Sequence, residues 1–155
     1  GGVPIQFVYM LVVIVISGLI LNRTKFGRNI YAVGDNKQAA SYSGINSRRV
    51  TMTVFVIMGI FASCAGILSS ARTFSAQFNV GEGSEMDAIS AVVLGGTSMS
   101  GGVGRLSGTI IGCIVIGVLN NGMNILGIDS SWQYVVKGVV VLIAVFIDYI
   151  KKMKD

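Results

Sequence analysis

The chain has 155 residues, of which 52% are hydrophobic and only 12% are charged. This composition excludes an ordinary soluble domain, since so apolar a chain must turn most of its surface toward lipid or toward other helices. It also carries 21 glycines against one proline. That balance suits packed membrane helices, in which small residues let backbones approach closely.

Four long apolar stretches are the main structural signal. A bilayer core about 30 Å thick requires about 20 apolar residues of helix, and a soluble helix rarely stays apolar on all faces for that long. The four stretches are Val3–Leu21, Thr51–Ala71, Leu106–Leu126 and Trp132–Ile150. We therefore expect an all-α integral membrane protein, folded as a polytopic helical bundle.

Charged residues are distributed unevenly between these stretches. The first connection, Asn22–Val50, carries six Lys and Arg residues against Asp35 alone, whereas Arg72–Asp87 carries one Arg against three carboxylates. Cytoplasmic loops of membrane proteins are enriched in Lys and Arg. We therefore expect residues 22–50 and the lysine-rich C-terminal tail to be cytoplasmic, and residues 72–87 to lie outside.

The cytoplasmic connection contains the pattern of a short helix. Asp35 suits the N-cap, Gln38 three residues later completes a capping box, and Gly44 suits the C′ position. This pattern predicts a helix within Gly34–Gly44, outside the bilayer. From the residues alone, it is either a docking element for a partner or a surface helix that ties two spans together.

The segment Ala88–Gly104 has to provide an additional crossing. With residues 72–87 outside and the tail inside, an odd number of crossings must separate them, and the two spans that follow supply only two. A run of seven mostly apolar residues precedes the glycine-rich half, which is too short to cross as a helix. We expect a broken crossing at 88–104, which brings the total to about five; a re-entrant hairpin is the alternative. Small residues then recur every four positions, which predicts close helix packing: Ser100, Gly104, Gly108 and Gly112.

Three asparagines, Asn120, Asn121 and Asn124, lie within the third of the four apolar stretches. An amide inside a membrane must find a partner. Hydrogen bonding between helices would account for these residues, and so would a polar lining that lets a hydroxyl-rich solute pass. We include Thr97 and Ser98 among the candidates for this lining.

The charged residues expected near the outer side have simple explanations. Lys137 is expected to extend its ammonium to the outer interface near Trp132 and Tyr134. The outer carboxylates are most simply those of a solvated loop: Glu82, Glu85 and Asp87.

The sequence offers no catalytic set. It has no histidine, and its two cysteines, Cys64 and Cys113, lack the spacing of metal ligands, so we expect neither catalytic nor metal-binding residues. It also lacks the Gly-x-x-x-x-Gly-Lys-[Ser/Thr] phosphate loop, so any ATP chemistry would have to come from a partner. The basic connection is not accompanied by an aromatic or glycine-rich nucleic-acid module. We therefore expect neither an enzyme nor a nucleic-acid-binding protein.

Several motifs occur in an order that resembles one family. The first, at residues 26–46, is Phe-Gly-Arg-x-x-Tyr-Ala-x-Gly-Asp-Asn-x-x-Ala-Ala-x-x-Ser-Gly-Ile-Asn. Gly-Gly-Thr-Ser at 95–98, Gly-Gly at 101–102 and Leu-Asn-Asn-Gly at 119–122 follow. In this order the motifs resemble the permease subunit of ribose-type bacterial ABC sugar importers, over nearly the whole chain. The resemblance implies the C-terminal half of such a permease.

The resemblance also implies partners and a docking element. In permeases of this kind, a cytoplasmic coupling helix docks into a groove on the ATP-hydrolysing subunit. The matching positions are Gly34, Asp35, Asn36, Ala39, Ala40 and Gly44. The implied partners are an ATP-binding cassette subunit, an extracellular or periplasmic sugar-binding protein, a second permease copy and membrane lipid. ATP would be used by the partner subunit, with no cofactor on this chain.

We expect residues 1–155 to form one transmembrane permease domain in the bacterial cell membrane. Its membrane segments would be 3–21, 51–71, 88–104 (broken), 106–126 and 132–150, with 22–50 as the cytoplasmic coupling loop. The expected function is import of a ribose-like monosaccharide, driven by a separate ATPase. Two alternatives stay open: a permease of the same superfamily for branched-chain amino acids or nucleosides, and a membrane scaffold or half-permease without transport.

Overall fold

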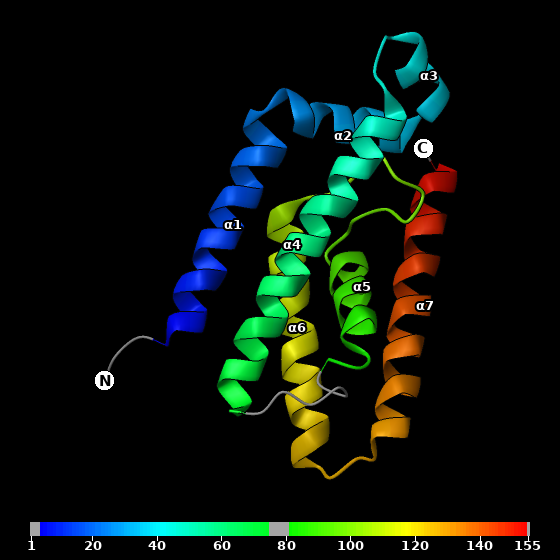
Figure 1. The fold of residues 1–155 in the computed structure, drawn as a ribbon. Coiled ribbons are helices and arrows are strands. Elements are labelled where there is room, and N and C mark those ends of the chain that lie inside the picture. Colours follow the sequence, from blue (N-terminus) through cyan, green and yellow to red (C-terminus); the bar gives the residue numbers. More distant parts are fainter. Residues whose placement is uncertain (1–3, 75–80, 155) are drawn as a thin grey trace. The chain divides into compact units, whose positions relative to one another are not determined.

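The structure is a computed structural model that describes residues 4–74 and 81–154. The described chain is built of helices, which confirms the expected all-α architecture (Figure 1). They are α1 (Ile5–Arg23), α2 (Lys25–Asp35), α3 (Lys37–Tyr42), α4 (Ser47–Thr73), α5 (Ser84–Leu94), α6 (Leu106–Ile125) and α7 (Ser130–Lys154). The chain divides into two compact units between Glu82 and Gly83, with α1 to α4 in the first and α5 to α7 in the second. A single permease domain over 1–155 stays a prediction.

The first unit turns sharply between α1 and α2. The Thr24 hydroxyl donates to the Ile20 carbonyl at 2.6 Å and accepts from the Gly27 amide at 3.1 Å, so one side chain caps α2 while it contacts the last turn of α1. Gly27 lies so close to the carbonyl of Leu21 that a Cβ would collide with it. The turn lets α2 contact both α1 and α4, across the end of the unit.

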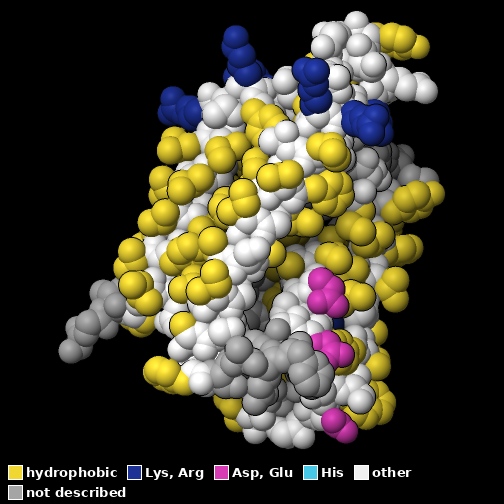
Figure 2. Space-filling model, viewed as in Figure 1, with side chains coloured by type: hydrophobic (Ala, Val, Ile, Leu, Met, Phe, Trp, Pro, Cys, Tyr) yellow, Lys and Arg dark blue, Asp and Glu magenta, His cyan; other side chains and the backbone are white. Residues whose placement is uncertain are grey.

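The two long helices of the first unit have the surface of membrane spans. α1 has no buried residue, and apolar side chains of α4 such as Phe55 and Val56 are exposed. Figure 2 shows hydrophobic side chains along α1 and α4, with Lys and Arg gathered where α2 and α3 lie. Among the described residues, α1, α4 and α6 are long and apolar enough to cross a membrane, and Ser130–Phe146 of α7 is a shorter apolar stretch.

The short cytoplasmic helix forms, but its start differs from the prediction. Asp35 is the last residue of α2, and Asn36 is the N-cap of α3, where its side-chain oxygen accepts from the amides of Gln38 and Ala39, each at 3.0 Å. The prediction of Asp35 as the N-cap was therefore wrong, because the preceding residues form a helix of their own that the sequence pattern did not reveal. The C-terminal signal was right: Gly44 has a φ of +80°, and the bonds around it form a Schellman motif.

The second unit is organised by close contact between α5 and α6. A Cβ on Gly108 would collide with the Gly95 carbonyl, and one on Gly112 would collide with the Ala91 carbonyl. The predicted small-residue packing is confirmed for these two glycines. Ser100 and Gly104 do not continue the row, because α6 begins only at Leu106.

The glycine-rich segment between α5 and α6 is not helical. Residues 95–105 form turns, in which the Thr97 amide donates to the Val92 carbonyl at 3.2 Å and the Ser98 amide to the Val103 carbonyl at 3.0 Å. The expected spans at 3–21, 51–71, 106–126 and 132–150 correspond to α1, α4, α6 and α7. Whether 88–104 crosses the bilayer, and the total of five crossings, stay predictions.

We predict that Gly112→Ala destabilises the protein while Gly122→Ala on the same helix does not. A methyl group on Gly112 meets the Ala91 backbone, whereas nothing lies within 4 Å of a Cβ on Gly122. Overpacking of this kind costs roughly 1–3 kcal/mol, whereas replacing an unconstrained helical glycine by alanine gains up to about 1 kcal/mol. Thermal unfolding of the purified protein in detergent measures both, and equal melting temperatures for the two variants would contradict the packing model.

Candidate functional site

Three polar side chains of the second unit meet from three different helices. Asp87 lies in the first turn of α5, Asn120 in α6 and Lys137 in α7. The Lys137 Nζ atom is 2.6 Å from Asp87 Oδ1, and the Asn120 side-chain amide donates to Asp87 Oδ2 at 2.9 Å. We call Asp87, Asn120 and Lys137 the polar triad.

The triad lies well inside the helical hairpin of α6 and α7. Asn120 is five residues before the last residue of α6, Ile125, which is about 8 Å along the helix. Lys137 is seven residues after Ser130, the first residue of α7, which is about 10 Å. Ionisable groups at such depth in apolar helices are costly unless they are paired, and they usually mark function.

The members of the triad are partly withdrawn from solvent, and Lys137 is the more buried side chain of the charged pair. The side chain of Lys137 is 12% exposed and that of Asp87 is 31% exposed. Lys137 Nζ also lies 5.6 Å from the centre of the Tyr134 ring, a cation–π distance. Tyr134 in turn packs on Gly83, the N-cap of α5, where a Cβ would come within 2.6 Å of the ring. The aromatic ring thereby ties α7 to the start of α5, the helix that carries Asp87.

One acceptor oxygen of the triad has no donor in the protein: Asn120 Oδ1 is buried and has no hydrogen-bond partner. Asp87 Oδ1 is also buried, but the Lys137 ammonium lies 2.6 Å from it and balances its charge. A buried oxygen such as Asn120 Oδ1 is uncommon and calls for a donor from water or from a ligand.

Cavities flank α5 on both sides of the triad. One of about 220 Å³ lies between α5 and α6 and is lined by Asp87, Ala88, Ala91, Cys113, Ile116, Gly117 and Asn120. The other, of about 360 Å³, lies between α5 and α7, with Tyr134 and Lys137 in its wall. Asp87 and Asn120 thus line the same space, whereas Lys137 lines the other.

The structure corrects two sequence-based expectations. The ammonium of Lys137 is paired with Asp87, where the sequence suggested a group without a partner, and its expected proximity to Tyr134 is confirmed. Asp87 is not a carboxylate of a solvated loop, since it belongs to α5 and is bonded from two neighbouring helices; Glu85, two residues earlier, is exposed. One signal could have revealed the pair: a Lys in the middle of an apolar helix. Burying its charge costs the least free energy when a carboxylate lies beside it.

The other predicted pathway residues are not gathered at the triad. The side-chain oxygen of Asn124 accepts from Gln133 of α7 at 2.9 Å, a bond that joins α6 to α7 near their connection. Asn121 is exposed. Thr97 and Ser98 follow the far end of α5, because α5 runs antiparallel to α6 from the Asp87–Asn120 contact to the Gly95–Gly108 contact. Of the predicted lining residues, only Asn120 belongs to the triad.

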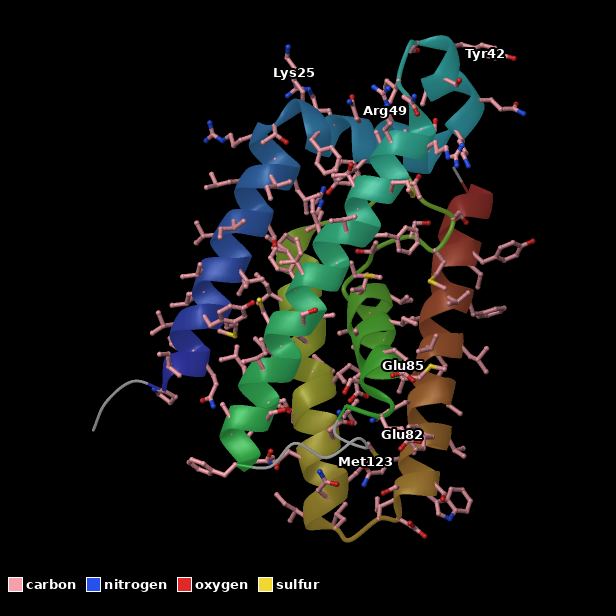
Figure 3. All side chains as sticks on the ribbon, viewed as in Figure 1. Lys25, Tyr42, Arg49, Glu82, Glu85 and Met123 are labelled. Carbon is pink, nitrogen blue, oxygen red and sulfur yellow. The ribbon has the colours of Figure 1, made fainter. Side chains whose placement is uncertain are left out.

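The predicted coupling positions divide into exposed and buried residues. Five of them are exposed: Gly34, Asp35, Asn36, Ala39 and Gly44. Ala40 is only 4% exposed, so its side chain faces the interior of its own unit. Tyr42 is 91% exposed, and Figure 3 shows it projecting away from α3, with Lys25 and Arg49 at the same end of the unit. A docking partner would therefore meet Ala39 and Tyr42 rather than Ala40.

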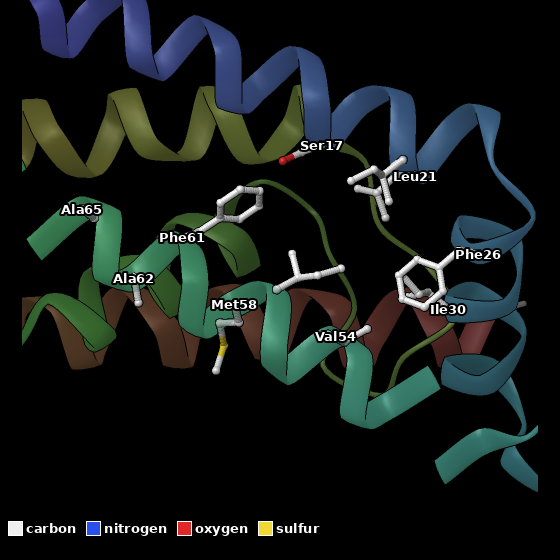
Figure 4. A pocket seen from close by; sticks show the side chains of 11 residues that line it. Ser17, Leu21, Phe26, Ile30, Val54, Met58, Phe61, Ala62 and Ala65 are labelled. Atoms are coloured by element: carbon white, nitrogen blue, oxygen red, sulfur yellow. The ribbon is translucent and has the colours of Figure 1, made fainter. Parts of the chain in front are cut away.

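The first unit holds an apolar cavity of about 500 Å³ between α1, α2 and α4 (Figure 4). Leu21 of α1, Phe26 of α2 and Phe61 of α4 line it, and Ser17 is the polar residue in its wall. A space lined in this way offers hydrophobic contact and almost no directional recognition. In the part of the chain that the structure describes, no group of three or more His, Cys, Asp or Glu side chains could hold a metal ion.

Comparisons with known proteins identify close relatives. A family model described as branched-chain amino acid transport system / permease component matches residues 2–145. The ribose import permease proteins of Bacillus subtilis (strain 168) and Escherichia coli (strain K12) are 49% and 48% identical over 147 residues, 95% of this chain and 46% of each relative. The xylose transport system permease protein of Haemophilus influenzae is 44% identical over 154 residues, 99% of this chain and 41% of the relative. The chain thus spans less than half the length of these relatives. No solved structure matches it. These findings confirm the resemblance to ribose-type sugar permeases.

We predict that removing one partner of the ion pair destabilises the protein more than removing both. Lys137→Met leaves the Asp87 carboxylate without its cation, and Asp87→Asn leaves the ammonium without its anion. Each single change should cost roughly 1–3 kcal/mol, less than the ~3–5 kcal/mol of fully buried pairs, because Asp87 is 31% exposed. The double variant should regain most of this stability, since no charge is left unpaired.

Thermal unfolding in detergent provides the measurement, and Glu85→Gln, on an exposed carboxylate of the same helix, serves as the control. A double variant whose loss equals the sum of the two single losses would show that the two groups do not interact.

Proposed function

The chain belongs to the family described as the branched-chain amino acid transport system / permease component, and on that premise we propose that it forms part of the membrane pathway of an ATP-driven monosaccharide importer. The observation that carries this proposal is the 49% identity over 147 residues to a protein named as a ribose import permease. A xylose transport permease at 44% identity supports the same class of solute. Because the relatives are more than twice as long as the matched region, the proposal concerns a whole transporter that contains this chain.

A second candidate solute is a branched-chain amino acid, which the family description favours. Such a solute is zwitterionic, so free side chains of opposite charge would suit its binding. The two charges of the triad are already bonded to each other, at 2.6 Å. A neutral sugar does not need to break this pair, and this difference supports the sugar over the amino acid.

The proposed place of the chain is the bacterial cell membrane, as a multi-pass protein. The apolar helices and the permease relatives support this. We propose that residues 22–50 and the C-terminal tail are cytoplasmic, because six Lys and Arg residues accompany Asp35 alone in that connection. The relatives are transport permeases, and we propose that this chain likewise has no enzymatic role.

The proposed power source is a separate ATP-binding cassette subunit, which would dock on α3. The exposure of Ala39 and Tyr42 at one end of the first unit supports this role, because a small residue beside an aromatic one suits insertion into a groove. The Lys and Arg side chains near α3 could meet an acidic rim around such a groove. An external sugar-binding protein and a second permease copy complete the proposed assembly.

Uptake measurements test the proposed solute. Cells that rely on the assembled transporter should accumulate labelled D-ribose, and unlabelled D-xylose should compete better than L-leucine. Competition by L-leucine in place of the pentoses would favour the amino-acid alternative. Absence of uptake for all three, with the transporter folded in the membrane, would favour a scaffold.

Two adjacent alanines provide a matched test of the coupling helix. Ala39→Glu should leave the amount of folded protein unchanged and reduce uptake, because an exposed methyl group is replaced by a larger charged side chain at the docking face. Ala40→Glu should instead lower the amount of folded protein, since Ala40 is 4% exposed and overpacking costs roughly 1–3 kcal/mol or more. Detergent-extracted folded protein, uptake and binding of the ATPase subunit are measured side by side. Normal uptake and normal ATPase binding in Ala39→Glu would retire the docking role of α3.

A further inference from the structure

The space between α5 and α6 combines two features that suit a hydroxyl-bearing solute. Asn120 Oδ1 is a buried acceptor with no donor in the protein, and Asn120 and the Asp87 carboxylate both line the cavity of about 220 Å³. A sugar offers hydroxyl groups, which donate, on a carbon frame that packs against Ala88, Ala91 and Ile116 in the same wall. Apolar walls with a few polar groups are the usual composition of small-molecule sites.

The size of the space also suits a small solute. A volume of 220 Å³ is below the ~300–1,000 Å³ of sites for drug-sized ligands, and equals about seven waters at ~30 Å³ each. A single monosaccharide is small enough to occupy a space of this volume.

We propose that Asp87 and Asn120 form a binding subsite for a neutral, hydroxyl-rich solute of monosaccharide size between α5 and α6. This inference rests on the proposed function and deepens it. Lys137 is a positioning residue in this subsite: it approaches Asp87 from the α7 side, holds the carboxylate toward α6 and balances its charge. The solute therefore meets a charged acceptor, whose hydrogen bonds are stronger than those of a neutral one, in a site without net charge.

A native thiol reports on this cavity directly. Cys113 lines it together with Asp87 and Asn120, and its side chain is exposed. In membrane vesicles that hold the assembled transporter with Cys64→Ala, the rate of alkylation of Cys113 by a small maleimide is followed with and without D-ribose. L-leucine is the control solute, and a variant with Cys113→Ala corrects for labelling elsewhere. D-ribose should slow the labelling and L-leucine should not.

Two variants separate solute binding from helix packing. In Asp87→Asn/Lys137→Met no charge is left unpaired, so the protein should fold, but the ribose concentration that half-protects Cys113 should rise roughly tenfold or more, because a hydrogen bond to a charged group is lost. In the charge-swapped Asp87→Lys/Lys137→Asp the pair is restored with its carboxylate on α7, so folding should recover and protection should not.

The outcomes decide the subsite independently of the proposed function. Lack of ribose protection in the unaltered triad, or protection in both double variants equal to that in the unaltered triad, overturns the subsite. The triad would then only hold the helices together, with water as the donor to Asn120 Oδ1. Uptake of D-ribose by the same vesicles, energised with ATP, reports on the proposed function alone. Uptake with no protection would therefore reject only the subsite, whereas protection with no uptake would support the subsite and reject the transport of ribose.

Discussion

The close approach of α5 to α6 is the constraint on which the second unit depends. Gly108 and Gly112 let the backbone of α6 lie against the carbonyls of Gly95 and Ala91, where a Cβ would not fit. In a membrane, helices gain little from the hydrophobic effect on meeting, so packing and hydrogen bonds must hold them together. The glycines fix the separation and the relative register of the two helices. That register places Asp87 opposite Asn120, four residues along α5 from Ala91.

The triad adds an ion pair and a hydrogen bond to this packing of apolar helices. A charge in an apolar hairpin is tolerated only with a partner, and a paired charge adds little stability over well-packed apolar residues. The Asp87–Lys137 pair therefore needs a reason other than stability. Its geometry suggests one, because Asp87 lines the cavity of about 220 Å³ beside α6 while Lys137 approaches from the side of α7. The same pair holds α5 against α7, together with Tyr134 and the glycine on which its ring packs.

In the first unit, the sharp turn after α1 leaves the short helix α3 largely exposed at one end. Thr24 and Gly27 turn the chain so that α2 crosses the ends of α1 and α4. α3 then projects beyond α2, with Ala40 packed inward and Ala39 and Tyr42 exposed. A helix of six residues makes few contacts of its own, so it depends on the Asn36 cap and the Schellman motif at Gly44 for its ends. This arrangement would present an exposed surface at the end of two membrane spans.

The sequence by itself determined that the helices are surrounded by lipid, where the membrane-spanning stretches approximately lie, and to which family the chain belongs. Runs of about 20 apolar residues predict membrane helices without any knowledge of their neighbours, and ordered motifs identify a family regardless of how the chain folds. The position of Gly44 at the C′ end of the short helix could also be predicted, because a C′ glycine depends on local backbone geometry alone. The tertiary structure alone decided that Asp87 and Lys137 join Asn120, and that Ala40 is buried while Ala39 is exposed. Asp87 and Asn120 are 33 residues apart in the chain. The physical reason is that helical periodicity tells which residues share a face of one helix, whereas the packing of helices decides which faces meet.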